Sequence, residues 1–410
     1  MKIAYLAPEI PALSATFVYK EILKLKSFGV KVVPFSVHRP LSEAVETELN
    51  DLKKEVVHLY ESSKTSVFRA HVFLLLTRPL RYLNSGVRLL SDIVSIGLFS
   101  RNAIGLVFRF FYAGTLAKAL IKQDCQHLHV HFAHVPTDIA MYASLLSGVS
   151  YSVTAHANDL FERGWLLKEK VGRSAFFATI SEFNKRFLAE KGIDIGTVRI
   201  VRCGVDDEQF EQRQSFVSGS TIKVGVVGRL VEKKGIDTLI RAIAVFRKQR
   251  FKVKLYIAGS GPMEQALKAL VIECGLSIED VFFIGALPNS YVAAFIASLD
   301  MFVLPCKMDE SGDMDGIPVV LMEAMLSGVP VISTVLSGIP ELICHRQTGL
   351  LVKPGDSEGL AAAMLLMMSD AELRDGMCAE AISRVKREFS LNVNTKILYE
   401  MFGVVINGNK

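Results

Sequence analysis

The stretch Asp315-Gly-Ile-Pro-Val-Val-Leu-Met-Glu323-Ala-Met, which runs on to Gly328-Val-Pro-Val-Ile-Ser, predicts a turn, an apolar helix and a β-branched strand. Pro318 suits the first helical position, because its fixed φ fits there and its missing N–H would be unpaired anyway. Glu323 lies one or two turns into the helix. A helix start favours anions, and we expect a nucleotide diphosphate here, with Glu323 at the ribose hydroxyls. The phosphate would lie at the backbone of Gly316, Ile317, Pro318, Val319 and Val320.

The rest of the chain repeats this alternation of short β-branched runs and longer helical patterns, which is typical of parallel α/β sheets. In the first half, the predicted strands are 2–6, 30–36, 127–131, 151–154, 175–180 and 198–202. In the second half, they are 223–227, 253–258, 281–284, 301–304 and 330–333. Segment 206–221 is polar and rich in Gln and Ser, with no apolar period, so we expect a linker between two domains there.

Size and cysteine usage set further limits. A chain of 410 residues is long enough for two domains with full cores. Its six cysteines show no paired spacing, which argues against a disulfide framework or a thiolate zinc site and suits a reducing cytosol. The apolar run at the N-terminus is too short for a signal peptide and breaks at Pro8, so we expect a first strand.

The net charge of +5 is unevenly distributed. Residues 1–205 carry 26 Lys+Arg against 17 Asp+Glu (+9), and 206–410 carry 21 against 25 (−4). Segment 64–122 holds nine basic residues and one acid, Asp92, among long apolar runs. Basic residues could also bind nucleic acid, but the interleaved Leu, Ile and Phe favour contact with an anionic membrane surface. The alternative is an amphipathic core helix with a solvated basic face.

A membrane-spanning helix is a third interpretation of the same segment. Residues 104–120 are almost long enough, but Arg109 lies inside this run and Lys118 near its end. An Arg at the bilayer centre costs about 2.5–3.5 kcal/mol on insertion scales. We therefore expect a cytoplasmic protein that contacts the inner face of the plasma membrane peripherally through 64–122 and binds no nucleic acid.

A second motif, Gly228-Arg-Leu-Val-Glu-Lys-Lys-Gly235, follows the predicted strand at 223–227. Glycine permits a tight strand-to-helix turn, and Arg229 and Lys234 can converge on one diphosphate. The alternative is a solvated basic loop. We assign no role to the neighbouring Lys233.

Together the two motifs resemble the G-R-L-x-x-x-K-G element and the acid-x7-acid signature of family 4 retaining glycosyltransferases. Asp315 stands where Glu is usual in that family. The resemblance implies the GT-B fold, with two Rossmann-like α/β domains whose parallel sheets face a central cleft. We expect an N-terminal acceptor domain over 1–205, completed by a C-terminal helix at 391–410, and a nucleotide-sugar domain over 222–390.

Two further segments resemble the exopolysaccharide subgroup of this family. In Thr154-Ala-His156-Ala-Asn-Asp159, the His follows a predicted strand, at the edge where α/β sites form. The resemblance implies that His156 faces the transferred sugar; a buried core histidine is the alternative, and Asp159 could instead cap a turn. The loop with Ser14 and Thr16 resembles a donor-binding element but lacks the Gly-Gly common in the family, and Ser14 is the donor-binding candidate.

Metal sites are the remaining alternative. His127, His129 and His131 alternate on one predicted strand and so share one face, but no Cys or acid lies near them at metal-like spacing. Asp313-Met-Asp315 forms a D-x-D that follows a flexible acidic loop, and the basic motif already supplies positive charge. We expect no metal and no cofactor.

The resemblance implies an enzyme, a retaining, metal-independent glycosyltransferase of surface polysaccharide biosynthesis. Its donor would be a nucleotide-diphospho sugar and its acceptor a saccharide, lipid-linked in our interpretation because a lipid diphosphate lies at the membrane surface. His156, Asp315, Arg229 and Lys234 are the catalytic candidates. A nucleotide-sugar 2-epimerase of the same fold and a non-catalytic nucleotide-sugar-binding subunit are the alternatives.

Overall fold

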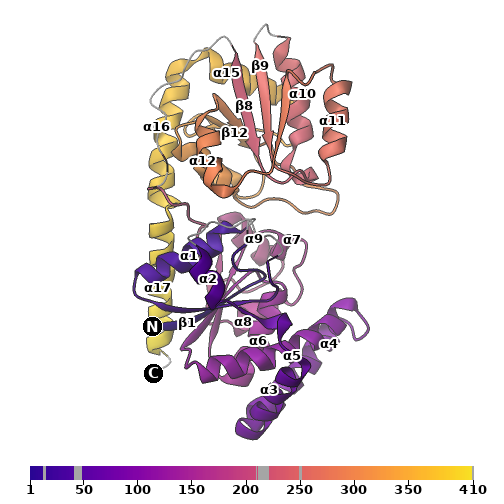
Figure 1. Ribbon diagram of the computed structural model, residues 1–410, viewed down its shortest axis with the longest axis vertical. Coiled ribbons are helices and arrows are strands. Elements are labelled where there is room, and N and C mark those ends of the chain that lie inside the picture. The colour runs from indigo at the N-terminus through magenta and orange to yellow at the C-terminus, as the bar shows by residue number, and fades with distance from the viewer. Residues whose placement is uncertain (13–14, 41–48, 209, 211–220, 249–251, 409–410) are drawn as a thin grey trace. The chain divides into compact units, whose positions relative to one another are not determined.

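The computed structural model describes residues 1–12, 15–40, 49–208, 210, 221–248 and 252–408. They form two compact units: the first contains Met1–Ile180, Asn184–Val201 and Thr395–Lys410, and the second Ser181–Phe183 and Arg202–Asn394. Each unit is built on a parallel sheet with helices packed on it (Figure 1), which confirms the predicted α/β class. Most of the predicted linker at 206–221 lies outside the described residues.

The sheet of the first unit has seven strands in the order β3-β2-β1-β4-β5-β6-β7. These strands are β1 (Lys2–Ala7), β2 (Lys31–Ser36), β3 (Val57–His58), β4 (His127–His131), β5 (Tyr151–Ala155), β6 (Phe177–Thr179) and β7 (Val198–Ile200). The helices are α1 (Thr16–Ser27), α2 (Asn50–Glu55), α3 (Lys64–Thr77), α4 (Pro79–Ile96), α5 (Arg101–Lys122), α6 (Val135–Ser147), α7 (Asn158–Phe161), α8 (Leu167–Arg173), α9 (Glu182–Glu190) and the terminal α17 (Leu391–Gly408), with a 3-10 turn η2 (Leu59–Glu61).

This sheet separates two cores, because alternate residues of a strand point to opposite faces. Ala4 and Leu6 of β1 join the core that includes residues of α3 to α6. Tyr5 joins the other core, with residues of α1 and with Leu398 and Phe402 of α17. The alternation in β4 follows the same rule, so its three histidines lie on the α1 and α17 face.

The sheet of the second unit has six strands in the order β10-β9-β8-β11-β12-β13. They are β8 (Ile222–Val227), β9 (Val253–Ala258), β10 (Val281–Gly285), β11 (Met301–Val303), β12 (Val331–Thr334) and β13 (Leu350–Val352). The helices are η3 (Glu232–Lys234), α10 (Ile236–Arg247), α11 (Glu264–Glu273), α12 (Asn289–Ala297), α13 (Val319–Leu326), α14 (Ile339–Leu342), α15 (Ser357–Ser369) and α16 (Ala371–Glu388). Every strand predicted from the sequence is present, with its ends shifted by at most two residues, and β3 and β13 were not predicted.

Candidate active site

The strand order places the two predicted motifs of the second unit at its switch point, where strands are added on both sides of the first strand. In the second unit β8 pairs with β9 on one side and β11 on the other, and in the first unit β1 pairs with β2 and β4. Ligands of open α/β sheets bind beyond the carboxyl ends of the strands at such a point. The loop after β8 holds Gly228, Arg229 and Lys234, and the segment after β11 leads to Asp315.

A cluster of charged side chains joins these two loops of the second unit. Lys234 Nζ lies 2.6 Å from Asp315 Oδ2. Lys233 Nζ lies 2.7 Å from Asp313 Oδ2 and 3.4 Å from Asp315 Oδ1. The carboxylate of Asp315 is therefore held by an ammonium group at each oxygen. Lys233, to which the sequence assigned no role, is part of the same cluster.

Both members of the central pair keep their charge. Burial disfavours the ammonium form of Lys234, but the charge of Asp315 outweighs it and raises the pKa of Lys234. Burial likewise disfavours the carboxylate, but the charges of Lys234 and Lys233 hold the pKa of Asp315 below its usual value. The Cys306 thiol lies 3.5 Å from Asp315 Oδ2, and its pKa is raised by burial, so this thiol stays protonated.

Glycine permits the close approach of the backbone in this region. Gly235 has φ +64°, and a Cβ there would overlap the carbonyl of Pro305. Gly259, with φ +147°, lies against the carbonyl of Gly228 in the same way. The backbone N–H of Lys307 donates to the carbonyl of Lys233 at 2.9 Å and ties the two loops together. A side chain at either glycine would displace the loop that carries the lysines.

Arg229 differs from the lysines. It is exposed, and within the described part of the chain its guanidinium makes no hydrogen bond or ion pair. Its charge still acts on Lys234. An unpaired guanidinium beside a paired lysine cluster is available to an incoming anion, and Arg binds two oxygens of a phosphate at once.

The helix after Asp315 begins one residue later than the sequence predicted. Pro318 has ψ 123°, which is extended, so it is the N-cap residue of α13 rather than its first helical residue. Gly316, Ile317 and the proline are buried. The N-cap residue Pro318 makes no side-chain hydrogen bond to the N–H groups of the first turn, which include those of Val319 and Val320. Glu323 is the only charged residue among the six buried positions of the helix.

In the first unit the candidate residue is His156, which follows β5. Its ring lies between Phe17 and Phe132, with ring centroids 4.6 Å away from each. Its backbone N–H donates to Asp159 Oδ1 at 3.0 Å, and the N–H of Ala133 donates to Asp159 Oδ2 at 2.7 Å. The Asp159 carboxylate therefore anchors the turns after β4 and β5. Burial raises the pKa of Asp159 to about 6 and lowers that of His156 well below its usual value, so the imidazole is neutral.

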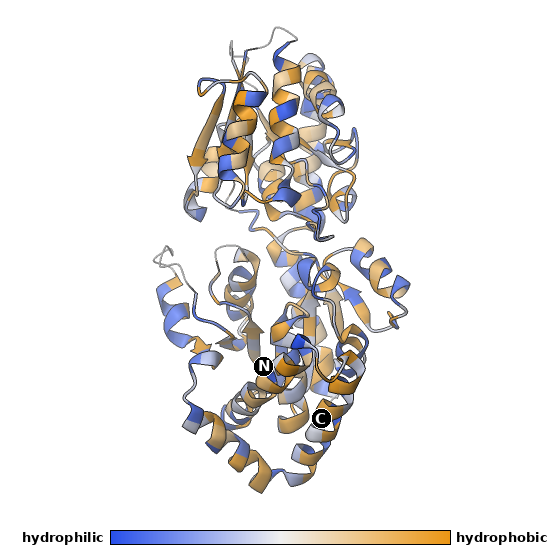
Figure 2. Ribbon diagram, turned by 90° about the vertical axis from the view of Figure 1, so that its right-hand side faces the viewer, coloured by the Kyte–Doolittle hydropathy of each residue, from blue (hydrophilic) through white to orange (hydrophobic). Residues whose placement is uncertain are grey.

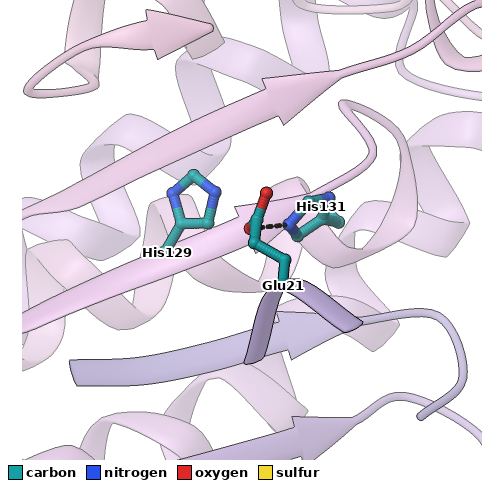
Figure 3. Close-up of side chains that lie close together, drawn as sticks. All are labelled: Glu21, His129 and His131. Atoms are coloured by element: carbon teal, nitrogen blue, oxygen red, sulfur yellow. Dashed lines mark hydrogen bonds and ion pairs between the residues drawn. The ribbon is translucent and has the colours of Figure 1, made fainter. Parts of the chain in front are cut away.

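The histidines of β4 line one face, as their alternation predicts, but the expectation that no acid lies near them was wrong. Glu21 of α1 reaches the same place, and one carboxylate oxygen and one ring nitrogen each from His129 and His131 lie within 4.8 Å of one another (Figure 3). The carboxylate accepts from His131 Nε2 at 2.9 Å. Sequence spacing could not reveal Glu21, since it lies 110 residues from His131. Ser14 lies outside the described residues.

Comparison with solved structures identifies the class of fold. The structure of HepE from Anabaena in complex with UDP covers 98% of this chain and 100% of its own, with a TM-score of 0.74 and 16% identity. At this identity the likeness concerns the fold, which is the two-domain GT-B fold of glycosyltransferases.

Comparison with sequences finds relatives among glycosyltransferases. Residues 207–384 match the family model described as glycosyl transferases group 1. The amylovoran biosynthesis glycosyltransferase AmsK of Erwinia amylovora is 32% identical over 253 residues, which cover 60% of this chain and 62% of AmsK. A GDP-mannose-dependent phosphatidylinositol monomannoside mannosyltransferase of Mycobacterium tuberculosis is 33% identical over 41% of this chain and 46% of its own. The chain thus spans less than two thirds of the length of these curated relatives.

Proposed function

We propose that this protein is a glycosyltransferase that moves a sugar from a nucleotide-diphospho sugar to a saccharide acceptor in surface polysaccharide biosynthesis. The observation that carries the proposal is the cluster at the switch point of the second unit. There, two lysines are held by Asp315 and an exposed, unpaired Arg229 lies beside them. Four charged groups in the loops after β8 and β11 are suited to a diphosphate. AmsK, named for amylovoran biosynthesis, supports the polysaccharide context.

The chemistry follows from where charge develops. As the bond between the anomeric carbon and the diphosphate breaks, the sugar becomes oxocarbenium-like and the leaving group gains negative charge. Arg229, Lys234 and the amides of the α13 start would stabilise that charge, usually a large contribution to catalysis. The acceptor hydroxyl would add on the same face and pass its proton to the departing phosphate. Configuration would then be retained.

We infer that these cations replace a metal ion in that role. Lys233 contacts both acids of the D-x-D sequence, so their carboxylates are already compensated by charge. Asp315 would offer its carboxylate to the sugar hydroxyls while it fixes the direction of both lysines. Glu323 would bind the ribose, and His156 the transferred sugar.

The donor base and sugar stay open. HepE is described in complex with UDP, and the mycobacterial relative is named for GDP-mannose. Pocket shape decides such choices, and it depends on side chains from several loops. A lipid-linked acceptor is the hypothesis favoured by the surface described next.

The helices α3 to α5 carry exposed apolar side chains. Figure 2 colours the ribbon by hydropathy, with hydrophobic residues in orange. On α4 the exposed apolar residues recur at helical spacing on one face and are between 63% and 82% exposed: Leu80, Leu83, Val87, Leu90 and Val94. Phe99, in the following turn, is 95% exposed. Exposed Arg81 and Arg88 lie on the same helix. An apolar face flanked by basic residues favours an anionic lipid surface, and we propose that α4 lies on the inner face of the plasma membrane.

The inner side of α5 explains why it would not cross the bilayer. Among the described residues, α5 is the helix whose length and apolar composition would allow it to span a membrane. One side of it belongs to the core of the first unit, with Leu106, Ala113 and Leu116 fully buried. Arg109 Nη1 on this helix lies 3.1 Å from buried Asp138 Oδ2. Insertion would break this packing and leave a buried carboxylate without that partner.

The donor experiment uses the purified full chain with a panel of nucleotide sugars, with and without EDTA, followed by NMR. We expect release or transfer from one donor that survives EDTA. Lys234→Ala should lower it by about 10²–10³, while Lys223→Ala, at an exposed position near the start of the preceding strand β8, should not. A donor that is turned over only with added metal would refute the metal-free mechanism, and inversion at the anomeric carbon would refute retention.

The membrane experiment compares vesicles with and without anionic lipid. Wild type should sediment with anionic vesicles only, and Leu83→Glu should weaken this binding. Ile278→Glu, at an 86% exposed position of the second unit, is the matched control. If the Leu83 variant binds vesicles normally but changes the sedimentation equilibrium mass, then α4 is a contact between copies instead.

A further inference from the structure

A buried chain of hydrogen bonds leads from α1 to the candidate sugar-facing histidine. Tyr5 Oη donates to Glu21 Oε1 at 2.5 Å, and the same oxygen lies 2.9 Å from His131 Nε2. On the other side of that ring, His131 Nδ1 lies 3.2 Å from His156 Nε2. The two imidazoles stack with an interplanar angle of 17°. Four side chains from β1, α1, β4 and the turn after β5 thus form one line of contacts.

The chemistry of each group decides which atom donates and which accepts in these hydrogen bonds. An ionised carboxylate only accepts hydrogen bonds, so Glu21 requires a hydrogen on His131 Nε2. A neutral imidazole carries one hydrogen, which leaves His131 Nδ1 as an acceptor. His156 must then donate from Nε2, and its own lone pair lies on Nδ1. Tyr5 stays protonated as the second donor to Glu21, because burial and the Glu21 charge raise its pKa.

We propose that Glu21 and His131 are positioning residues that fix the ring orientation and the tautomer of His156. In this tautomer Nδ1 is a hydrogen-bond acceptor, and a sugar hydroxyl can donate to such an atom. We call the line formed by Tyr5, Glu21, His131 and His156 the relay. Its role in sugar transfer rests on the proposed function. The tautomer itself does not.

Little of the relay is exposed. His131 is 1% exposed, and the Glu21 side chain is 12% exposed. Phe17 and Phe132 pack on the ring of His156, and Phe132 has φ +74°, a left-handed conformation that non-glycine residues adopt at a cost. That strained turn places an apolar ring against the imidazole of His156. The orientation of the imidazole is then fixed by its hydrogen bonds.

A metal ion held by Glu21, His129 and His131 is the competing explanation of the same cluster. The hydrogen bonds of His129 argue against it: its Nδ1 lies 2.8 Å from Ser152 Oγ and its Nε2 lies 3.1 Å from Thr154 Oγ1. Both ring nitrogens of His131 are likewise engaged within the relay. A metal would have to displace these partners in a mostly buried place.

The first test reads the tautomer directly and needs no substrate. Protein labelled with ¹⁵N-histidine would be examined by long-range ¹H–¹⁵N correlation, with His156 assigned from a His156→Gln variant. We expect the hydrogen on Nε2 in wild type and a mixture of tautomers in Glu21→Met, which keeps the side-chain length but removes the acceptor. Glu21→Gln, which keeps an acceptor oxygen, should retain the wild-type tautomer. A hydrogen on Nδ1 of His156 in wild type would overturn the proposal.

The second test reads the consequence for transfer. Glu21→Met should lower kcat about tenfold with little change in the KM of the donor, the size expected for one lost buried hydrogen bond, and Glu21→Gln should restore most of it. Tyr5→Phe, which removes the other donor to the same carboxylate, should have a smaller effect. An unchanged kcat in Glu21→Met would overturn the role in transfer, and absence of any transfer in wild type would concern the proposed function alone.

Metal analysis of the purified protein completes the test. We expect no stoichiometric metal, and His129→Gln, which retains amide partners for Ser152 and Thr154, should leave the tautomer of His156 unchanged. A bound ion that is lost in both His129→Gln and Glu21→Met would replace the relay with a metal site.

Discussion

The two units have the same kind of strand order, with a switch point in each sheet. They carry different kinds of polar group at the carboxyl ends of their strands. In the first unit, His131 and His156 stack on each other and lie against tilted phenylalanine rings, and the neutral imidazole of His156 needs no countercharge. In the second, Lys234 and Asp315 are also mostly buried, but both stay charged, each compensated by the other.

The difference follows from what burial costs. A neutral ring needs only hydrogen bonds to be buried, whereas an ionised group must also find an opposite charge. A site of neutral rings is suited to uncharged hydroxyls, and a site of paired charges with a spare guanidinium is suited to a diphosphate. On the proposed function, the transferred sugar would contact the neutral ring of His156 in the first unit as well as Asp315, whereas the phosphates would be bound by the second unit. The variants below test this contrast.

The largest effect is expected from Lys234→Ala. Without the ammonium group, the leaving diphosphate loses a cation that we place at its developing charge, and turnover should fall by about 10²–10³. Steady-state kinetics of sugar transfer measure this, with Lys223→Ala as the matched control. Turnover within threefold of wild type would remove Lys234 from the mechanism, and thermal unfolding of the variant would show whether Asp315 tolerates its loss.

Glu323→Ala should act on binding rather than on the chemical step. The carboxylate is buried in an otherwise apolar helix, and the loss of charge-assisted hydrogen bonds to ribose hydroxyls should weaken nucleoside diphosphate binding about tenfold or more. Calorimetry with UDP and GDP measures the affinity. Glu358→Ala, at an exposed position in the first turn of α15, is the control, and unchanged affinity in Glu323→Ala would refute the ribose role.

The features of the fold and the site that could be predicted are those encoded by residues close together in the sequence. The strands carry short β-branched runs, and all those predicted are present. Of the two that were not predicted, β3 has two residues, too few for a pattern, and β13 has three, as many as the predicted β6, β7 and β11. The glycine-rich turn at Gly228 and the helix at α13 are also local signals. The site residues drawn from them therefore lie at the switch point of the second unit.

Contacts between distant segments left no such signal. Glu21 lies in an ordinary amphipathic helix, and only the fold brings it to His131. Lys233 and Lys234 are adjacent in sequence, and nothing local shows that both reach Asp315. The start of α13 moved by one residue because Pro318 adopts an extended ψ, a choice that the sequence leaves open. The roles of the site residues stay predictions.

The smallest effect separates the two units by pH. Burial lowers the pKa of His127 and of His134 to about 3 in the folded chain, against about 6.5 when unfolded. Below pH 6.5 these histidines bind protons in the unfolded chain but stay neutral in the folded chain. The free energy of unfolding therefore falls as pH falls from about 6.5 towards 3. At pH 5.5 the loss is about 1.4 kcal/mol for each of these histidines. Asp159, whose pKa is raised to about 6, takes up a proton in the fold and offsets part of the loss.

The second unit should not share this sensitivity. Asp315 has a lowered pKa, so its contribution is present above the unfolded value of about 3.9 and is lost only below it. Trp165, the single tryptophan of the chain, donates to Asp138 at 3.0 Å in the first unit, and its fluorescence reports urea unfolding there at pH 7.5 and 5.5. Hydrogen exchange of β4 against β8 compares the units directly. Equal loss of protection in both strands at pH 5.5 would contradict the contrast between neutral rings and paired charges, whereas His127→Gln should reduce the loss in β4 alone.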